Sequence, residues 1–185
     1  GDERRAVYRI STRGGEARKF FEDELNVGSF DVSSDGRWLA FLSAEKKDPD
    51  RLMLESKGFN QEIFEENLKF ARLHLADLQS GEGPADRTVK TLEIDGSLRS
   101  LRFSPDGRRL LVEVTPTPLV DDALVAQQLR VVDLDGRVVA SIESEGKIGQ
   151  ADWSPDGRHI AMISSLDRND PAPGRLMLIS ADGGM

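Results

Sequence analysis

The sequence has no cysteine and only two histidines, His74 and His159, among its 185 residues. The missing thiol excludes disulfide bonds, cysteine-ligated zinc, iron–sulfur clusters and a cysteine nucleophile. Two histidines leave little material for a histidine-based metal centre or catalytic cluster. We therefore expect neither a metal ion nor a cofactor in this chain.

Long apolar runs and an excess of basic residues are also missing. No stretch reaches the roughly 18 apolar residues that a membrane-spanning helix needs, so we expect no membrane span. The 33 acidic residues outnumber the 25 basic ones, and the net charge is −8. This balance argues against a nucleic-acid partner, because phosphate binding depends on concentrated Lys and Arg. The hydrophobic fraction of 38% and the charged fraction of 31% fit a folded globular chain.

A repeated turn motif is the most informative feature that the sequence does contain. Three segments, in 30–43, 102–115 and 152–165, share Ser, then Pro or Ser, then Asp, Gly and Arg, followed by an apolar run. The shared pairs are Asp35–Gly36, Asp106–Gly107 and Asp156–Gly157. Pro presets φ for a type I turn, and Gly accepts the left-handed conformation after it. We interpret these residues as structural turn residues and not as catalytic acids.

The runs between the turns predict the fold class. Each first turn leads into a short apolar run that is typical of a strand buried on both faces, as in Leu110–Val114. A second hairpin follows, as at Asp135-Gly136, which separates two apolar runs. The unit is thus four antiparallel strands, A to D, and such sheets repeated radially form a β-propeller. We predict an all-β propeller arc with thirteen strands, or about three and a quarter blades, cut from a larger ring.

The predicted division of the chain follows from this register. Residues 1–22 supply strands C and D of one blade, and residues 23–92 form a blade with a long insert between strands B and C at 44–70. Residues 93–145 form the next blade, and residues 146–185 supply strands A to C of the last. This insert at 44–70, which contains phenylalanines and glutamates in its second half, is predicted to form a short helix on one propeller face.

The Ser-Pro-Asp-Gly-Arg units resemble the WD40-like blades of TolB-like proteins and of the prolyl oligopeptidase (S9) family of serine peptidases. Segments 116–122 and 166–177 resemble loops of bacterial S9 propellers, and the B–C connections are longer than is usual in TolB blades. The resemblance implies a noncatalytic propeller segment of a bacterial S9 peptidase. Such a segment would shape or gate the access of a peptide substrate to a hydrolase domain outside this chain.

Catalytic residues are not expected within the chain itself. The nucleophile elbow G-x-S-x-G does not occur in residues 1–185, so the parent protein's enzymatic status stays open. In dipeptidyl-peptidase relatives an adjacent Glu pair holds the substrate's amino group, which nominates Glu65 and Glu66 as substrate contacts. A solvated helix face is the plainer interpretation of that pair. Calcium ligation by Asp121-Asp122 or by the loop at 167–170 is less favoured than turn formation, because neither has EF-hand spacing.

Other functions remain open at this stage. A TolB-like periplasmic interaction scaffold without enzymatic activity is the main alternative, and a propeller lyase or sugar-binding module is a third. The resemblance favours the periplasm of a bacterium over the cytoplasm. The open blade edges predict self-association, with Val7–Ile10 and Leu176–Ile179 at the contact.

Overall fold

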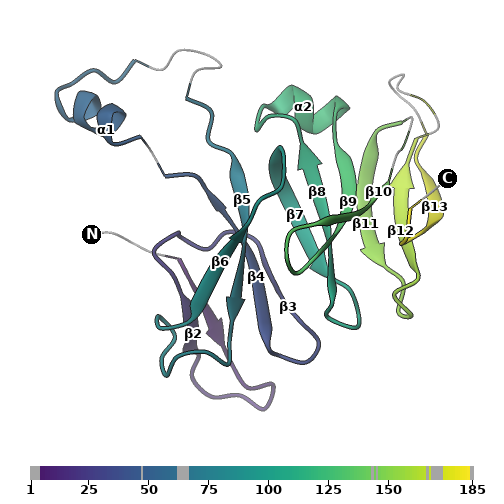
Figure 1. The fold of residues 1–185 in the computed structure, drawn as a ribbon, viewed down its shortest axis with the longest axis horizontal. Helices are drawn as coiled ribbons and strands as arrows, with labels where there is room; N and C mark the ends of the chain where they lie inside the picture. Colours follow the sequence, from purple (N-terminus) through teal and green to yellow (C-terminus); the bar gives the residue numbers. More distant parts are fainter. Residues whose placement is uncertain are drawn as a thin grey trace.

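The computed structural model describes residues 5–46, 48–61, 67–142, 144, 146–165, 167 and 173–183. Within this part of the chain, thirteen strands form four antiparallel sheets that follow one another in chain order across the molecule (Figure 1). The first sheet contains β1 (Ala6–Arg9) and β2 (Arg18–Glu22). The second contains β3 (Phe30–Val32), β4 (Trp38–Ala44), β5 (Ala71–Asp77) and β6 (Thr88–Leu92). The third contains β7 (Ser97–Phe103), β8 (Arg109–Thr115), β9 (Gln128–Asp133) and β10 (Val138–Ile142), and the fourth contains β11 (Ile148–Trp153), β12 (His159–Ser164) and β13 (Arg175–Ser180).

Strand order within each sheet is the order along the chain. The second sheet runs β3-β4-β5-β6, the third runs β7-β8-β9-β10, and the fourth runs β11-β12-β13. Each sheet is therefore a simple meander whose strands are joined by hairpin connections. The prediction of an all-β, open and partial β-propeller with four-stranded blades is confirmed.

The apolar strands are buried because each sheet is covered by its neighbours. One cluster, which includes Phe21 and Phe41, fills the seam between the first and second sheets. A second cluster, which includes Leu75 and Leu101, fills the next seam, and a third joins Val131 of the third sheet to Ile160 of the fourth. An inner sheet that packs on both sides needs apolar residues at successive positions, which explains the nearly unbroken run in β4.

The connections gather on two opposite faces of the arc. The tight turns that join β3 to β4, β7 to β8 and β11 to β12 lie on one face, which we call the turn face (Figure 1). The long connections between β4 and β5 and between β8 and β9 lie on the other, which we call the loop face (Figure 1). They carry the two helices, α1 (Pro49–Ser56) and α2 (Val120–Val125).

Helix α1 lies in the first half of the long insert at 44–70, for which a short helix is predicted. Asp48 provides the N-cap, because its side chain accepts a hydrogen bond from the main-chain N–H of Asp50, and Pro49 follows where proline is favoured. No residue of α1 is buried, so this segment projects from the loop face. In the described ranges, no helix is long and apolar enough to cross a bilayer.

Candidate functional site

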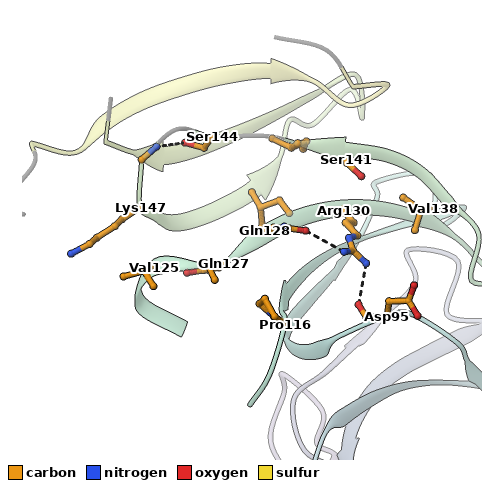
Figure 2. Close-up of a pocket in the computed structure, with 14 residues that line it drawn as sticks. Asp95, Pro116, Val125, Gln127, Gln128, Arg130, Val138, Ser141, Ser144 and Lys147 are labelled. Carbon is orange, nitrogen blue, oxygen red and sulfur yellow. Dashed lines mark hydrogen bonds between the residues drawn. The ribbon is translucent and has the colours of Figure 1, made fainter. Parts of the chain in front are cut away.

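A hollow of the surface lies on the loop face, beside strands β9 and β10 of the third sheet (Figure 2). It is a pocket of about 700 Å³. The end of α2 and the start of β9 form one wall with Val125 and Gln128, while β10 contributes Val138. The connections that precede β7 and β11 bring Asp95 and Lys147 to its edge. Segments of the third blade and two inter-blade connections thus meet here.

Arg130 is the best-defined charged group of this pocket. Its Nη1 donates to the main-chain oxygen of Asp95 at 3.0 Å, and its Nη2 donates to Oε1 of Gln128 at 3.1 Å (Figure 2). Both acceptors are uncharged, and Arg130 forms no ion pair with any residue that the structure describes. The guanidinium is therefore held in a fixed position while its charge remains available to an anionic group.

The remainder of the lining is suited to a ligand with both polar and apolar parts. Val125 and Val138 are exposed on its rim, and Gln127 offers an amide that can both donate and accept hydrogen bonds. The Ser144 hydroxyl accepts a hydrogen bond from the main-chain N–H of Gly146 at 3.3 Å (Figure 2). The arrangement can bind an extended polar chain that carries small apolar side chains and a carboxylate.

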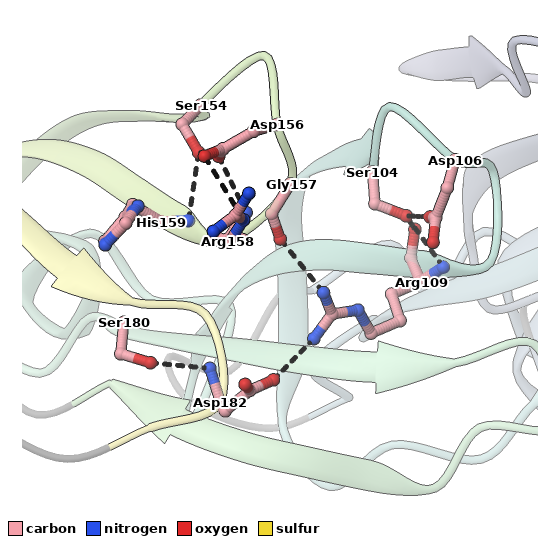
Figure 3. Close-up of polar contacts among 10 residues, drawn as sticks. All are labelled: Ser104, Asp106, Arg109, Ser154, Asp156, Gly157, Arg158, His159, Ser180 and Asp182. Carbon is pink, nitrogen blue, oxygen red and sulfur yellow. Dashed lines mark hydrogen bonds and ion pairs between the residues drawn. The ribbon is translucent and has the colours of Figure 1, made fainter.

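Each repeated turn on the turn face satisfies its polar groups internally (Figure 3). In the third sheet, Ser104 Oγ donates to Asp106 Oδ1 at 2.6 Å and accepts from the main-chain N–H of Arg109 at 2.9 Å. Asp106 Oδ1 also accepts from Arg108 N, and Gly107 has φ +69°. The same contacts recur around Asp35 and Gly36 and around Asp156 and Gly157.

These contacts set the protonation of the turn aspartates. The serine hydroxyl is the largest cause that holds the pKa of Asp106 below its ordinary value of 3.8, and main-chain donation from Arg108 acts in the same direction. The pKa values of Asp35 and Asp156 are lowered for the same first reason. Carboxylates that are ionised and occupied by their own turn are poorly placed to act as general acids.

Arg109 joins the third and fourth sheets on the same face (Figure 3). Its Nη1 donates to Asp182 Oδ1 and its Nη2 donates to the main-chain oxygen of Gly157, both at 3.0 Å. The guanidinium carbon also lies 5.2 Å from the ring centroid of Trp153. The side chain of Arg109 therefore links the third and fourth blades on the turn face.

Neither histidine belongs to a catalytic arrangement in the described structure. His74 is buried in β5, where its Nδ1 lies 3.0 Å from Thr91 Oγ1 and its ring packs on Phe41 at a centroid distance of 5.1 Å. Burial lowers the pKa of His74 below 6.5, against smaller opposing effects of nearby acidic groups. His159 donates its main-chain N–H to Ser154 Oγ, so its described hydrogen bond belongs to the turn.

The acidic residues singled out from the sequence fall in different places. Glu65 and Glu66 lie outside the described residues. Asp122 is used within its own connection, because its Oδ2 accepts from both the main-chain N–H and the hydroxyl of Thr117, at 2.9 and 2.5 Å. Of the loop at 167–170, only Asp167 is described. Across the described part of the chain, no group of three His, Asp or Glu side chains is placed to hold a metal ion.

The loop-face pocket was missed by sequence reasoning. Its charged residues Asp95, Arg130 and Lys147 stand in three separate segments and share no motif. The one usable signal was the length of the connection before β9, since long connections often carry function.

The chain resembles known proteins in its fold, and the sequence comparisons give no match. No protein-family model and no curated protein sequence matches it. A protein assigned as TolB from Agrobacterium tumefaciens matches over 100% of this chain and 56% of its own length, with a TM-score of 0.61 and 19% identity. The tricorn protease matches over 91% of this chain and 14% of its own, with a TM-score of 0.50 and 16% identity. The chain thus spans about half the length of the TolB structure, and it shares the β-propeller fold with both.

Proposed function

We propose that this chain is a noncatalytic propeller segment of an S9-type serine peptidase, where it shapes or gates peptide access to a hydrolase domain. The repeated Ser-Pro-Asp-Gly-Arg turns, which resemble those of S9 propellers, support the proposal. The fold shared with the tricorn protease, a peptidase, is compatible with it. Acyl transfer by a catalytic triad would take place in the hydrolase domain, because residues 1–185 contain no nucleophile elbow.

The loop-face pocket is the observation that carries the peptide-handling role. Arg130 supplies a fixed positive charge, Gln127 supplies a main-chain-like amide, and Val125 and Val138 supply apolar contacts. A short peptide presents the matching groups, namely amides, small side chains and a terminal carboxylate. We expect the pocket to select peptides by holding the carboxylate at Arg130 while the apolar rim accepts a small side chain.

Peptide binding tests this role directly. Fluorescence anisotropy with N-terminally labelled tri- to hexapeptides should show saturable binding that Arg130→Ala weakens about tenfold or more, because a charge-assisted contact is lost. Arg108→Ala is the matched control, since Arg108 is exposed on the turn face and should leave the affinity unchanged. Thermal melts of both variants show whether the fold is retained. Absence of binding, or equal losses in the two variants, would contradict a role for the pocket.

The chain alone should have no hydrolytic activity. We expect no turnover of peptidyl nitroanilides or nitrophenyl esters, because a nucleophile, its base and an oxyanion site are all needed for acyl transfer. Turnover that persists through repurification would contradict the noncatalytic assignment.

A TolB-like interaction scaffold without enzymatic activity is the second candidate. The TolB structure, which matches over the whole chain, favours it. Exposed apolar residues on α2, Val120 and Leu124, suit the flat surface of a folded partner better than a peptide. The surrounding reading frame separates the candidates: a downstream G-x-S-x-G followed by Asp and His supports the peptidase, and a gene that encodes a propeller without that motif supports the scaffold.

A further inference from the structure

The connection between β6 and β7 places an acidic side chain beside the positive charge of the loop-face pocket. Asp95 lies in this connection and lines the pocket, and its main-chain oxygen accepts the hydrogen bond from Arg130 Nη1 at 3.0 Å. The carboxylate of Asp95 is exposed and has no hydrogen-bond or ion-pair partner among the described residues. Figure 2 shows this carboxylate and the guanidinium at the same end of the pocket, with Lys147 at the opposite end. This end of the pocket therefore presents both a cation and an anion.

The two charges at this end do not neutralise each other by direct contact. Arg130 donates to the main-chain oxygen of Asp95 and not to its carboxylate. The neighbouring cation, Arg72, donates to the main-chain oxygen of Gly96 at 3.1 Å, but it is already paired with Glu45 at 2.6 Å. Both charges of the pocket therefore remain open to a ligand that carries the opposite charges.

The main chain that carries Asp95 is held on both sides. Ile94, which precedes it, is 3% exposed and belongs to the cluster between the second and third sheets. Gly96, which follows it, has φ +100°, and an added Cβ there would lie 2.6 Å from the main-chain oxygen of Thr115. The connection is thus packed closely against the end of β8, and the hydrogen bond from Arg130 holds it at a third point. The acidic group is therefore positioned before a ligand arrives, which reduces the entropy cost of binding.

We propose that the loop-face pocket prefers peptides whose C-terminal residue is lysine or arginine. This inference rests on the proposed peptide-handling function, in which Arg130 binds the terminal carboxylate. A C-terminal basic residue carries an anion and a cation together, so its side chain pairs with Asp95 while its carboxylate pairs with Arg130. The side chain of the preceding residue then meets the apolar rim. A terminal glutamate would bring a second anion to Asp95, and the same carboxylate therefore rejects it.

Fluorescence anisotropy with N-terminally labelled tetrapeptides tests this preference. One peptide ends in lysine and another in norleucine, which has nearly the same shape without the charge. The lysine peptide should bind about threefold to tenfold more tightly, and a peptide that ends in glutamate should bind more weakly than either. Asp95→Asn should abolish the difference between lysine and norleucine, since it removes the anion but keeps the main-chain oxygen that Arg130 contacts. Glu82→Gln is the matched control: it removes one negative charge from the β5–β6 connection, outside the pocket lining, and should keep the preference.

A charge reversal and the Arg130 variant separate the ways in which this inference can fail. Asp95→Lys should transfer the preference from the lysine peptide to the glutamate peptide, whereas Arg130→Ala should weaken all three peptides. Equal affinities of the wild type for the lysine and norleucine peptides, or a preference that survives Asp95→Asn, would overturn the inference. Binding that still depends on Arg130 would in that case support the peptide-handling role alone. Absence of binding by every peptide would overturn both proposals.

Discussion

The turn face and the loop face of the same blades differ in how their connections are stabilised. On the turn face, each Ser-x-Asp-Gly-Arg segment satisfies its own polar groups, and Ser34 Oγ donates to the main-chain oxygen of Pro105 in the neighbouring blade. On the loop face, the connections differ in length and sequence, and α1 and α2 have no buried residue. The repeat therefore fixes one face as a scaffold and leaves the connections of the other face free to vary in length and sequence.

The largest expected difference between the faces concerns glycines at positive φ. Gly107 has φ +69°, and an added Cβ would lie 3.3 Å from the Cβ of Ser33. Gly107→Val, and likewise Gly157→Val, should lower the free energy of unfolding by roughly 1–3 kcal/mol, because a β-branched residue is strained at positive φ.

Gly58, beside α1, is the matched control on the loop face, because it also has positive φ but no atom lies within 4 Å of an added Cβ. Gly58→Val should cost less than about 1 kcal/mol, since local unfolding of α1 relieves the strain. Urea denaturation measures all three, and equal losses would contradict the distinction between the faces.

A smaller effect is expected from the arginines. Arg109→Ala removes the contacts with Asp182, with the main-chain oxygen of Gly157 and with the Trp153 ring, and should cost about 1–2 kcal/mol. Arg51 on α1 pairs with Glu55 and donates to the main-chain oxygen of Gln61. Arg51→Ala should cost less than about 0.5 kcal/mol, because these contacts lie within one exposed segment. Thermal denaturation of the two variants checks the order, and a reversed order would show that the turn face does not join the blades.

As the pH falls, the first loss of folding stability should come from His74, which lies in the seam between the first two sheets. Its folded-state pKa is below the unfolded value near 6.5, so neutral His74 stabilises the fold above that pH. This contribution is lost as the pH falls through the lowered folded-state pKa. The urea midpoint of the wild type should therefore drop between about pH 7.5 and pH 5, and His74→Gln should drop less. Parallel curves for the two proteins would exclude His74 as the cause.

The smallest effect is expected from the turn carboxylates. Their pKa values lie below 3.8, so their hydrogen bonds stabilise the turns above that pH and are lost only at stronger acidity. Carboxyl chemical shifts in NMR titrations should show Asp106 ionised at pH values where a model-peptide Asp is half protonated. Ser104→Ala should move the pKa of Asp106 upward, since it removes the largest cause of the shift. An unchanged titration would contradict the serine's role.

The sequence allowed most of the fold to be predicted, because the turn motif is local. Asp106 and Gly107 define their hairpin through contacts within six residues, and the runs that follow are apolar on both faces. Helix α1 lies within the insert at 44–70, for which the sequence predicts a short helix, and its bounds follow from the Asp48-Pro49 start signal. The pocket could not be predicted, since the main-chain oxygen of Asp95 meets Arg130 only after β7, β8 and β9 have paired. Contacts between distant segments carry no local pattern.

The fluorescence of the two tryptophans can report on how the blades of this arc pack. Trp38 packs against the cluster between the second and third sheets, and Trp153 is buried between the third and fourth, where its indole N–H donates to the main-chain oxygen of Arg102 at 3.1 Å. Each of these two seams thus contains one indole, and the chain has no other tryptophan. A single replacement, Trp38→Phe or Trp153→Phe, leaves an intrinsic fluorophore that reports on one seam alone. Stopped-flow fluorescence of the pair would show whether the blades separate together or one after another.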